Sequence, residues 1–468
     1  MVYIIQSLIH EWDQFEYEIK YVVYDESLPN EIYEYAISNE FNETIDVSLD
    51  VYVADGNLHY LFTNTPTLSA EEIISHENTI VIPITSTTIE LLEEKTNNLD
   101  FIHFVTVENS KVSPVITHKI EKEAVVKIET VNDFFDMLIS SKTRGSYYML
   151  QNDLDFTDYN RNFPYLDGGF NRFQGIFDGQ NFALKNIDIH RYSGGVFHTV
   201  EGGIIKNVIF DNIKIEVADK PIYDEDGNLS GSVKAGDRSG IVAGRTFGKA
   251  WFENIVIKNS SLNSNTNYAG LLVGRIETGS TIYAKNIKLI DSTINANGNT
   301  GGLLGSVDQK SEAHVEDIYI HTVNVESTDD MVAVLISRLR GIATGQRIVI
   351  INTEIKSNRN MGGLIGKVNS ETTYGFFKDV FINNRNNTER IPESNRSYGQ
   401  IAGNLDVQLE PLVNVWGTNT HAGGGLNIPS DTLLEDMSVV NENFWTTNFP
   451  NIVSNENWEI VDGILKLK

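Results

Sequence analysis

The sequence predicts an all-β protein, a right-handed parallel β-helix (solenoid) preceded by an antiparallel β-sandwich. Three observations predict this fold. A glycine phrase recurs at near-constant spacing between Gly194 and Gly403, a polar phrase recurs with the same period, and the intervening chain consists of short β-branched runs with few helix formers. Two marks that stay in phase indicate a repeating structural unit, because chance composition would not keep them in step.

The glycine phrase has the form Gly-x-apolar-apolar-Gly. Its copies are Gly240-Ile-Val-Ala-Gly244, Gly270-Leu-Leu-Val-Gly274, Gly301-Gly-Leu-Leu-Gly305, the glycine-free Val332-Ala-Val-Leu-Ile336, Gly362-Gly-Leu-Ile-Gly366 and Gly399-Gln-Ile-Ala-Gly403. Their first residues are 30, 31, 31, 30 and 37 positions apart, and an earlier copy, Gly194-Gly-Val-Phe-His198, lies 46 residues before Gly240. Glycine is expected where the chain turns without room for a Cβ.

The polar phrase is a polar residue followed by alternating apolar positions. Its copies open at Asn207, Asn254, Asn286, Asp317, Arg347 and Asp379, with spacings of 47, 32, 31, 30 and 32, and Asn186-Ile-Asp-Ile precedes the set. We expect each Asn or Asp to lie at a corner of the coil, where its side chain tolerates left-handed backbone and stacks into a ladder with the next coil. Such a column is structural rather than functional.

A period of about 31 residues favours a solenoid over a propeller, because a propeller blade needs about four strands in roughly 40 residues. A solenoid coil needs only two or three short strands separated by tight corners, each pairing with its equivalents in the neighbouring coils.

The segment from Phe173 to Ile189, which contains Phe173-Gln-Gly-Ile-Phe-Asp178-Gly179 and Asn186-Ile-Asp-Ile, together with the repeats that follow, resembles the GLUG-type β-helices. The resemblance spans about residues 130–404. That family occurs in bacterial surface adhesins, in the non-catalytic part of IgA-cleaving metallopeptidases and in phage tail proteins. The resemblance therefore implies a fold but leaves the function open.

Residues 1–120 carry none of the repeat and alternate with a period of two, which predicts a small antiparallel sandwich with a hairpin turn at Asp55-Gly56-Asn57. This segment faintly resembles the immunoglobulin-like anchoring domains of some phage fibre proteins. Residues 121–146 are expected to be a linker with a helix that begins at Thr130, carries Asp133 in its first turn, and plugs the first coil.

Residues 147–404 form the predicted β-helix, and residues 405–468, with Trp416, Trp445 and Trp458, are expected to cap it. The tryptophans could alternatively form an exposed recognition patch.

Two segments depart from the repeat, and insertions in solenoids often lie on the binding face. The first runs from Asp158 to Arg172 and combines aromatic rings with polar side chains, as sugar recognition requires. Its candidate glycan contacts are Tyr159, Arg161, Phe163, Tyr165, Phe170 and Arg172. The alternative is that its rings cover the first coil. The second runs from Asp219 to Arg238, and its acidic Asp224–Asn228 stretch indicates a hairpin tip rather than a calcium loop.

Composition excludes several classes of function. A formal net charge of −28 argues against nucleic acid and against anionic membranes, which both attract basic surfaces. The chain has no cysteine, so it has no disulfide or thiolate metal site. No run is long and apolar enough for a membrane helix, and the first twelve residues do not have the form of a signal peptide. We expect neither metal nor cofactor.

No catalytic motif is present, since His76-Glu77 lacks the second histidine of a metalloprotease helix and no nucleophile elbow or phosphate loop occurs. The leading hypothesis is a phage virion structural protein, a tail appendage, fibre or tailspike, because the first residues lack the form of a signal peptide, a distinct β-rich domain opens the chain, and the expected solenoid is rigid and acidic. Its N-terminal domain would bind other tail or baseplate proteins, and its β-helix, which could be part of a homotrimer, would bind a host surface glycan. A bacterial surface adhesin and a β-helix polysaccharide depolymerase are the alternatives.

Overall fold

The computed structural model describes residues 126–140, 147–159, 172–190, 194–218, 238–328, 331–370, 374–385, 397–407, 409, 412–418 and 425–468, together with the backbone of strands outside these ranges. The chain divides into two compact units. The first comprises residues 1–126 and 145–148, and the second comprises residues 127–144 and 149–468.

The first unit consists of short strands that pair antiparallel in separate small sheets. These strands are β1 (Val2–Ile4), β2 (Ser7–Leu8), β3 (Phe15–Lys20), β4 (Val23–Asp25), β5 (Ile32–Asn39), β6 (Ile45–Asp46), β7 (Leu49–Ala54), β8 (Leu58–Asn64), β9 (Thr67–Leu68), β10 (Asn78–Pro83), β11 (Phe101–Thr106) and β12 (Ile116–Glu121). The β7–β8 pair surrounds the expected turn at residues 55–57, which itself lies outside the described residues. Because no side chain of this unit before residue 126 is described, its packing as a sandwich stays a prediction.

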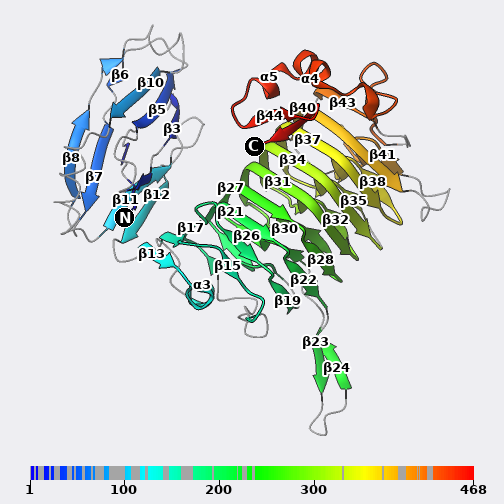
Figure 1. Ribbon diagram of the computed structural model, residues 1–468, viewed down its shortest axis with the longest axis horizontal. Helices are drawn as coiled ribbons and strands as arrows, with labels where there is room; N and C mark the ends of the chain where they lie inside the picture. Colours follow the sequence, from blue (N-terminus) through cyan, green and yellow to red (C-terminus); the bar gives the residue numbers. More distant parts are fainter. Residues whose placement is uncertain are drawn as a thin grey trace. The chain divides into compact units, whose positions relative to one another are not determined.

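The second unit is a parallel β-solenoid of about seven turns over residues 147–417 (Figure 1). Each regular coil runs through a 15-stranded sheet, a six-stranded sheet and an eight-stranded sheet in that order. The 15-stranded sheet contains β13 (Val125–Ile128), β14 (Tyr147–Leu150), β15 (Leu154–Asp155), β17 (Ile176–Asp178), β18 (Ala183–Lys185), β19 (Asp188–Arg191), β21 (Ile204–Asp211), β22 (Lys214–Val217), β27 (Lys249–Lys258), β28 (Ser261–Ser264), β31 (Thr281–Ala296), β34 (Glu312–Ser327), β37 (Ile342–Lys356), β40 (Tyr374–Asn387) and β43 (Val413–Gly417).

The two smaller sheets complete the coil. The six-stranded sheet contains β25 (Arg238–Gly240), β29 (Tyr268–Gly270), β32 (Asn299–Gly301), β35 (Val332–Ala333), β38 (Asn360–Gly362) and β41 (Ser397–Gly399). The eight-stranded sheet contains β16 (Arg172–Phe173), β20 (Thr199–Glu201), β26 (Ala243–Phe247), β30 (Val273–Ile276), β33 (Leu304–Val307), β36 (Ile336–Leu339), β39 (Ile365–Val368) and β42 (Ala402–Leu405). The predicted parallel solenoid is confirmed.

The period of the sequence is the contour length of one coil. Ile287, Ile318, Ile348 and Val380 pair with one another in adjacent strands, at separations of 31, 30 and 32 residues, and none of the four is exposed to solvent. The interior is thus built from aliphatic columns that run along the solenoid. Full burial of one such side chain contributes about 1.5–3 kcal/mol.

The polar phrase forms the predicted corner ladder. Asn207, Asn254, Asn286, Asp317, Arg347 and Asp379 all have positive φ between 52° and 54°. The Nδ2 of Asn254 donates to Asn207 Oδ1 at 2.7 Å, and the Nδ2 of Asn286 donates to Asn254 Oδ1 at 2.8 Å. Short amide side chains can adopt this backbone and satisfy one another across coils.

The predicted positions of two residues within the repeat, Asn186 and Val332, are wrong. Asn186, which we had set before the corner residues, bonds to Asn212 and belongs to a second corner column, which continues through Asn259. The glycine-free phrase begins at Ala333 and not at Val332, because Ala333 pairs with Gly301 and with Gly362. At this corner a Cβ on Gly301 or Gly362 would overlap a carbonyl oxygen of its own turn, so alanine fits only where the corner relaxes.

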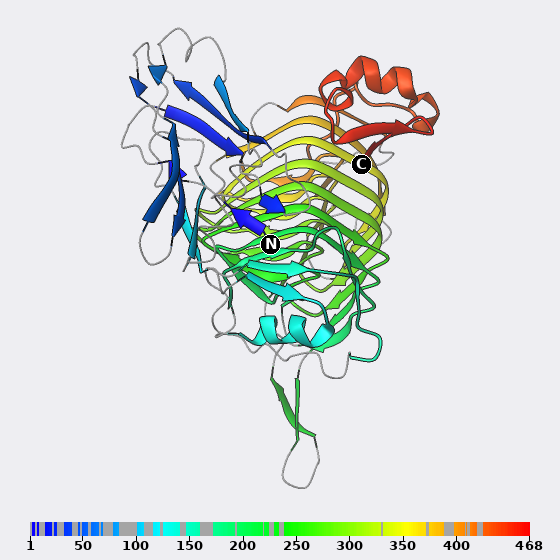
Figure 2. The same cartoon turned by 60° about the vertical axis from the view of Figure 1, so that its left-hand side comes forward.

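The predicted capping helix is α3 (Val131–Ile139), with Thr130 as N-cap. The backbone N–H of Asp133 donates to Thr130 Oγ1 at 3.2 Å, and the Thr130 N–H donates to the Asp133 carboxylate at 2.8 Å. Phe134 contacts Phe156 and Phe177 edge-on, with ring centroids 5.6 and 5.7 Å apart. The helix therefore plugs the first coils, as expected, and Figure 2 shows it beside the first strands of the solenoid.

The C-terminal segment closes the last coil and also packs on the outer wall of the solenoid. Residues 425–434 close the last coil, with Leu426 bonded to Ala402 and Leu434 to Gly417. Beyond them lie η4 (Met437–Val439), α4 (Glu442–Asn448), α5 (Pro450–Val453), β44 (Trp458–Val461) and β45 (Ile464–Leu467), which pack on the outer wall of β34, β37 and β40 through one apolar cluster. Trp445 and Trp458 are buried there, so the alternative of an exposed tryptophan patch is wrong for these two residues.

Candidate functional site

The structure describes two of the six predicted glycan contacts. Tyr159 is 36% exposed, and its ring packs edge-on against Phe135 of the capping helix at a centroid distance of 6.5 Å. Arg172 forms an ion pair with Glu201 at 3.1 Å and lies over the ring of Phe247 at 4.7 Å. Tyr159 thus packs on the capping helix and Arg172 is paired within the solenoid, and neither contact tests whether the rings of this insertion bind sugar or cover the first coil.

The other four predicted contacts, Arg161, Phe163, Tyr165 and Phe170, lie outside the described residues. The same holds for the acidic stretch at residues 224–228, which connects β23 (Lys220–Tyr223) and β24 (Leu229–Val233). These two strands pair antiparallel and project from the solenoid as a hairpin (Figure 1), as the interpretation of that stretch as a hairpin tip requires. Neither insertion supplies a described binding site.

A different surface brings aromatic and polar side chains together. It is the outer face of the 15-stranded sheet, on the part of each strand that precedes the corner ladder. Trp251, Tyr283, His314, Thr344 and Phe376 pair in register on five successive strands, from β27 to β40. Their neighbours along the strand, such as Ile282 and Ala284, are buried, so these side chains point outward. We call Trp251, Tyr283, His314 and Phe376 the ring row, which Thr344 interrupts.

Three of the rings lie nearly parallel to one another. The centroids of Trp251 and Tyr283 are 5.5 Å apart with an interplanar angle of 15°, and those of Tyr283 and His314 are 5.1 Å apart at 20°. His314 is further fixed by contacts of Nδ1 with Thr344 Oγ1 at 2.8 Å and of Nε2 with Glu312 at 3.1 Å. The rings are therefore preorganised on a rigid sheet, which lowers the entropic cost of binding a ligand to them.

A second row runs beside the first, two residues further along each strand. It consists of Glu253, Lys285, Glu316, Gln346 and Lys378, and we call it the polar row. Lys285 Nζ lies 3.4 Å from Glu316 Oε1, and Gln346 Nε2 donates to Glu316 Oε2 at 3.0 Å. Because the Lys285 and Glu316 side chains are 47% and 31% exposed, a ligand can still reach their remaining donors and acceptors.

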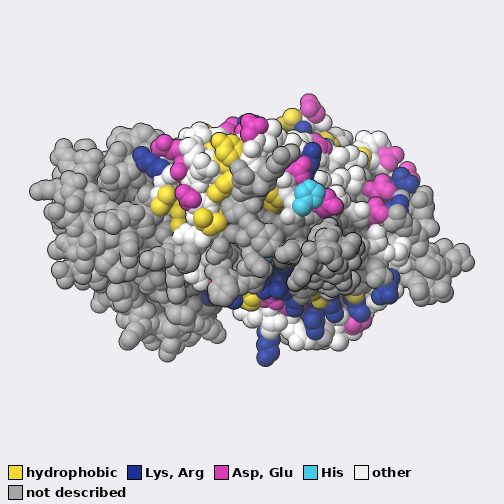
Figure 3. Space-filling view, turned by 90° about the horizontal axis from the view of Figure 1, so that it is seen from below, with side chains coloured by type: hydrophobic (Ala, Val, Ile, Leu, Met, Phe, Trp, Pro, Cys, Tyr) yellow, Lys and Arg dark blue, Asp and Glu magenta, His cyan; other side chains and the backbone are white. Residues whose placement is uncertain are grey.

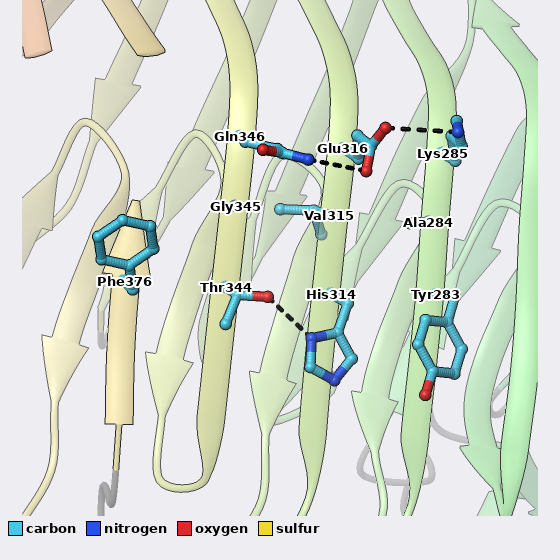
Figure 4. A pocket seen from close by; sticks show the side chains of 10 residues that line it. All are labelled: Tyr283, Ala284, Lys285, His314, Val315, Glu316, Thr344, Gly345, Gln346 and Phe376. Atoms are coloured by element: carbon cyan, nitrogen blue, oxygen red, sulfur yellow. Dashed lines mark hydrogen bonds and ion pairs between the residues drawn. The ribbon is translucent and has the colours of Figure 1, made fainter. Parts of the chain in front are cut away.

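A hollow of about 360 Å³ lies over these two rows. Figure 4 shows Tyr283, His314, Thr344 and Phe376 in one line across neighbouring strands, with Lys285, Glu316 and Gln346 in a parallel line. The hollow coincides with the interruption of the ring row, since Thr344 is shorter than the rings on either side of it. Its volume is within the usual range for small-ligand sites.

Beyond the corner, the same wall is closed by the chain itself. Trp458 Nε1 donates to Asp317 Oδ1 at 2.6 Å, and the Trp458 ring contacts Tyr319 edge-on at 6.4 Å. Burial raises the pKa of Tyr319 to about 12, with a smaller contribution from Asp291, and burial also lowers the pKa of His321. The C-terminal segment therefore covers one part of the wall and leaves the ring row outside its cluster.

The eight-stranded sheet carries a row of basic side chains whose donors are bonded within the protein. Arg245, Arg275, Arg338 and Lys367 occupy one register along this sheet. Arg275 donates to Asp308 at 2.5 Å and Lys367 pairs with Asp406 at 3.2 Å, while Arg338 donates to Asn369 at 3.1 Å. On the face shown in Figure 3, Lys and Arg side chains gather along the lower edge, and Asp and Glu side chains are more frequent above them.

Two carboxylates of the site lie on the same strand. Glu312 and Glu316 lie four residues apart on β34, or roughly 13 Å along an extended strand. Glu316 is moreover engaged by Lys285, Gln346 and Arg347. Among the described residues, no group of three or more His, Asp or Glu side chains is arranged to hold a metal ion.

The sequence carries a signal for these two rows. Each member of the ring row lies three residues before a corner residue, as Tyr283 does before Asn286 and Phe376 before Asp379, and each member of the polar row lies one residue before it. Aligning the coils on the corner residues would have shown both rows. The glycine spacing alone did not, because it marks a corner between the two smaller sheets.

The fold and this surface define the chain as a parallel β-solenoid with an outward-facing, half-buried row of rings beside a row of polar side chains. No family model matches the chain, and no curated protein matches it. Among solved structures it is similar to a protein from Bacteroides ovatus provisionally named an immunoglobulin A1 protease, with 15% identity and a TM-score of 0.40, over 75% of this chain and 92% of that one. This similarity is too low to carry an argument. In the described part of the chain, no helix has the length and apolarity to cross a membrane.

Proposed function

We propose that this chain is a non-enzymatic recognition protein that presents a β-solenoid to a host surface glycan, as a tail appendage or fibre of a phage virion does. The observation that supports glycan recognition is the ring row with its parallel polar row. A sugar ring has apolar C–H faces that pack on aromatic rings, and a rim of hydroxyl groups that needs donors and acceptors nearby. Because Tyr283 is stacked between Trp251 and His314, the row offers room for a sugar beside its rings at Thr344, where the stack is interrupted.

The assignment to a virion rests on the division of the chain into two units. In this proposal the N-terminal strands form the predicted sandwich and attach to other tail or baseplate proteins, while the solenoid, wound in the right-handed sense, acts outside the cell and could be part of a trimer. A stacked coil suits that task, because every strand of its interior is paired and resists local opening.

The experiment is a binding and degradation assay on intact polysaccharide. The purified chain is incubated with insoluble cell-wall and capsular polysaccharides, and both the bound protein and the released reducing ends or unsaturated sugars are measured. We expect binding without release. Release of sugars would show a depolymerase, and absence of binding to every polysaccharide would overturn the proposal of glycan recognition.

The virion assignment has its own test, which is the genomic neighbourhood together with immunogold labelling of particles. Portal, collar and lysin genes beside this gene and label at the tail would support it. A secretion or sortase cluster would instead identify a bacterial adhesin. The two tests are separate, so glycan recognition survives if only the virion assignment fails.

A further inference from the structure

We infer that the ring row binds a linear, neutral glycan that lies along the solenoid axis, with one pyranose unit over the hollow at Thr344. This inference rests on the proposed function and specifies its ligand and the direction in which the ligand lies. It is carried by the register of two rows across five strands and by the single short side chain in the ring row.

The direction follows from the spacing of the strands. Neighbouring strands are about 4.8 Å apart, so the row from Trp251 to Phe376 spans roughly 19 Å along the axis. A glycan laid along the axis meets a new strand about once per sugar unit. Laid across the axis it would leave the rings after one unit, because the ring row is a single residue wide.

The mode of contact follows from the separation of the two rows. Residues two apart on one strand point to the same side and lie about 7 Å from each other. A six-membered sugar ring held at Thr344, where the stack of rings is interrupted, therefore brings its rim hydroxyls to the polar row. At the hollow, the polar side chains within reach of these hydroxyls are Gln346 and Glu316, and the rings of Phe376 and His314 lie on either side of the hollow.

The neutral character follows from the charges around the hollow. Glu316 and Asp317 carry two negative charges, Lys285 and Arg347 pair with them and carry two positive charges, and Gln346 carries no charge. An anionic polymer would also be repelled by a chain of net charge −28. The polar row thus offers donors and acceptors in alternation, as a hydroxyl-rich neutral ligand requires.

The test is to fill the hollow by the substitution Thr344→Tyr. A tyrosine at this position loses the contact of Thr344 Oγ1 with His314 Nδ1 but gains ring contacts with His314 and Phe376, so we expect the fold to be kept while the hollow is closed. The matched control is Thr293→Tyr, an exposed position on β31 outside both rows. Both variants are first compared with the wild type by thermal unfolding.

Binding is measured by calorimetry with cellotetraose, chitotetraose, maltotetraose and, as the anionic probe, a hyaluronan tetrasaccharide. We expect at least one neutral probe to bind the wild type and the Thr293→Tyr control alike. We expect Thr344→Tyr to bind that probe at least about tenfold more weakly with a similar Tm.

Three outcomes would overturn the inference. Equal binding by Thr344→Tyr and the wild type would exclude the hollow as the binding position while leaving glycan recognition intact. Preference for hyaluronan would remove the neutral ligand. Absence of binding to every probe removes the inference as well, and the polysaccharide assay then decides whether glycan recognition falls with it.

Discussion

The corner ladder gives the sharpest prediction about stability, and Asn254 is the residue at which to test it. Its φ is 52°, and its side chain both donates to Asn207 and accepts from Asn286. Asn254→Ala removes both hydrogen bonds, each contributing about 1 kcal/mol, and places a Cβ-bearing residue without a compensating amide in left-handed backbone, at about 1–2 kcal/mol. We expect the free energy of unfolding to fall by about 3–4 kcal/mol.

A glycine at the same position separates the two causes. Asn254→Gly also loses both hydrogen bonds, but glycine adopts positive φ freely, so we expect it to be about 1 kcal/mol less destabilising than alanine. The assay is urea unfolding followed by circular dichroism, and the control is Asn263→Ala at an exposed position on β28. If Asn254→Ala behaves like this control, or if glycine is worse than alanine, the ladder does not stabilise the coil as argued.

Three further predictions concern other parts of the second unit. Gly301→Ala should lower the free energy of unfolding by more than about 3 kcal/mol, because the added Cβ would overlap backbone atoms. Gly279→Ala should lower it by only about 1–2 kcal/mol, because that glycine has open space around it and a φ of 77°. The unfolding midpoints of the two variants test this difference. Trp458→Phe loses the hydrogen bond to Asp317, about 1.5–3 kcal/mol, and should speed proteolysis of the C-terminal segment, while unchanged cleavage would contradict the contact. Partial burial acts against ionisation of Asp133, but hydrogen bonds from its N-cap outweigh it and lower its pKa. The stability that this group contributes is therefore complete above about pH 4 and lost as pH falls through the lowered value, and Asp133→Asn should flatten this dependence in acid unfolding.

The coil was predictable because coils stacked along one axis impose a regular repeat on the sequence. Each coil contacts its neighbours in the same way, so Gly270 and Gly301, or Asn254 and Asn286, meet the same constraint and carry the same residue type. The helix at Thr130 was predictable for a local reason, since both partners of its cap lie within three residues.

The errors in alignment have a physical cause as well. At Val332 the apolar pattern continues through the corner without a glycine, so nothing in the local sequence distinguishes Val332 from Ala333 as the turning residue. Asn186 has the residue type of a corner, but a coil has more than one corner that accepts asparagine. Only the hydrogen-bonded register separates these possibilities.

The sequence by itself determined the period, the stacking of coils and the residue types at the corners, because these depend on contacts between equivalent positions. Only the tertiary structure decided which outward side chains share a row, and that the C-terminal segment covers the wall at Asp317 while the wall at Thr344 stays hollow. The first physical reason is that Trp458 and Asp317 are 141 residues apart in the chain, so no periodic or local rule relates them. The second is that outward-facing side chains lack the packing constraints that make the buried columns recognisable in the sequence.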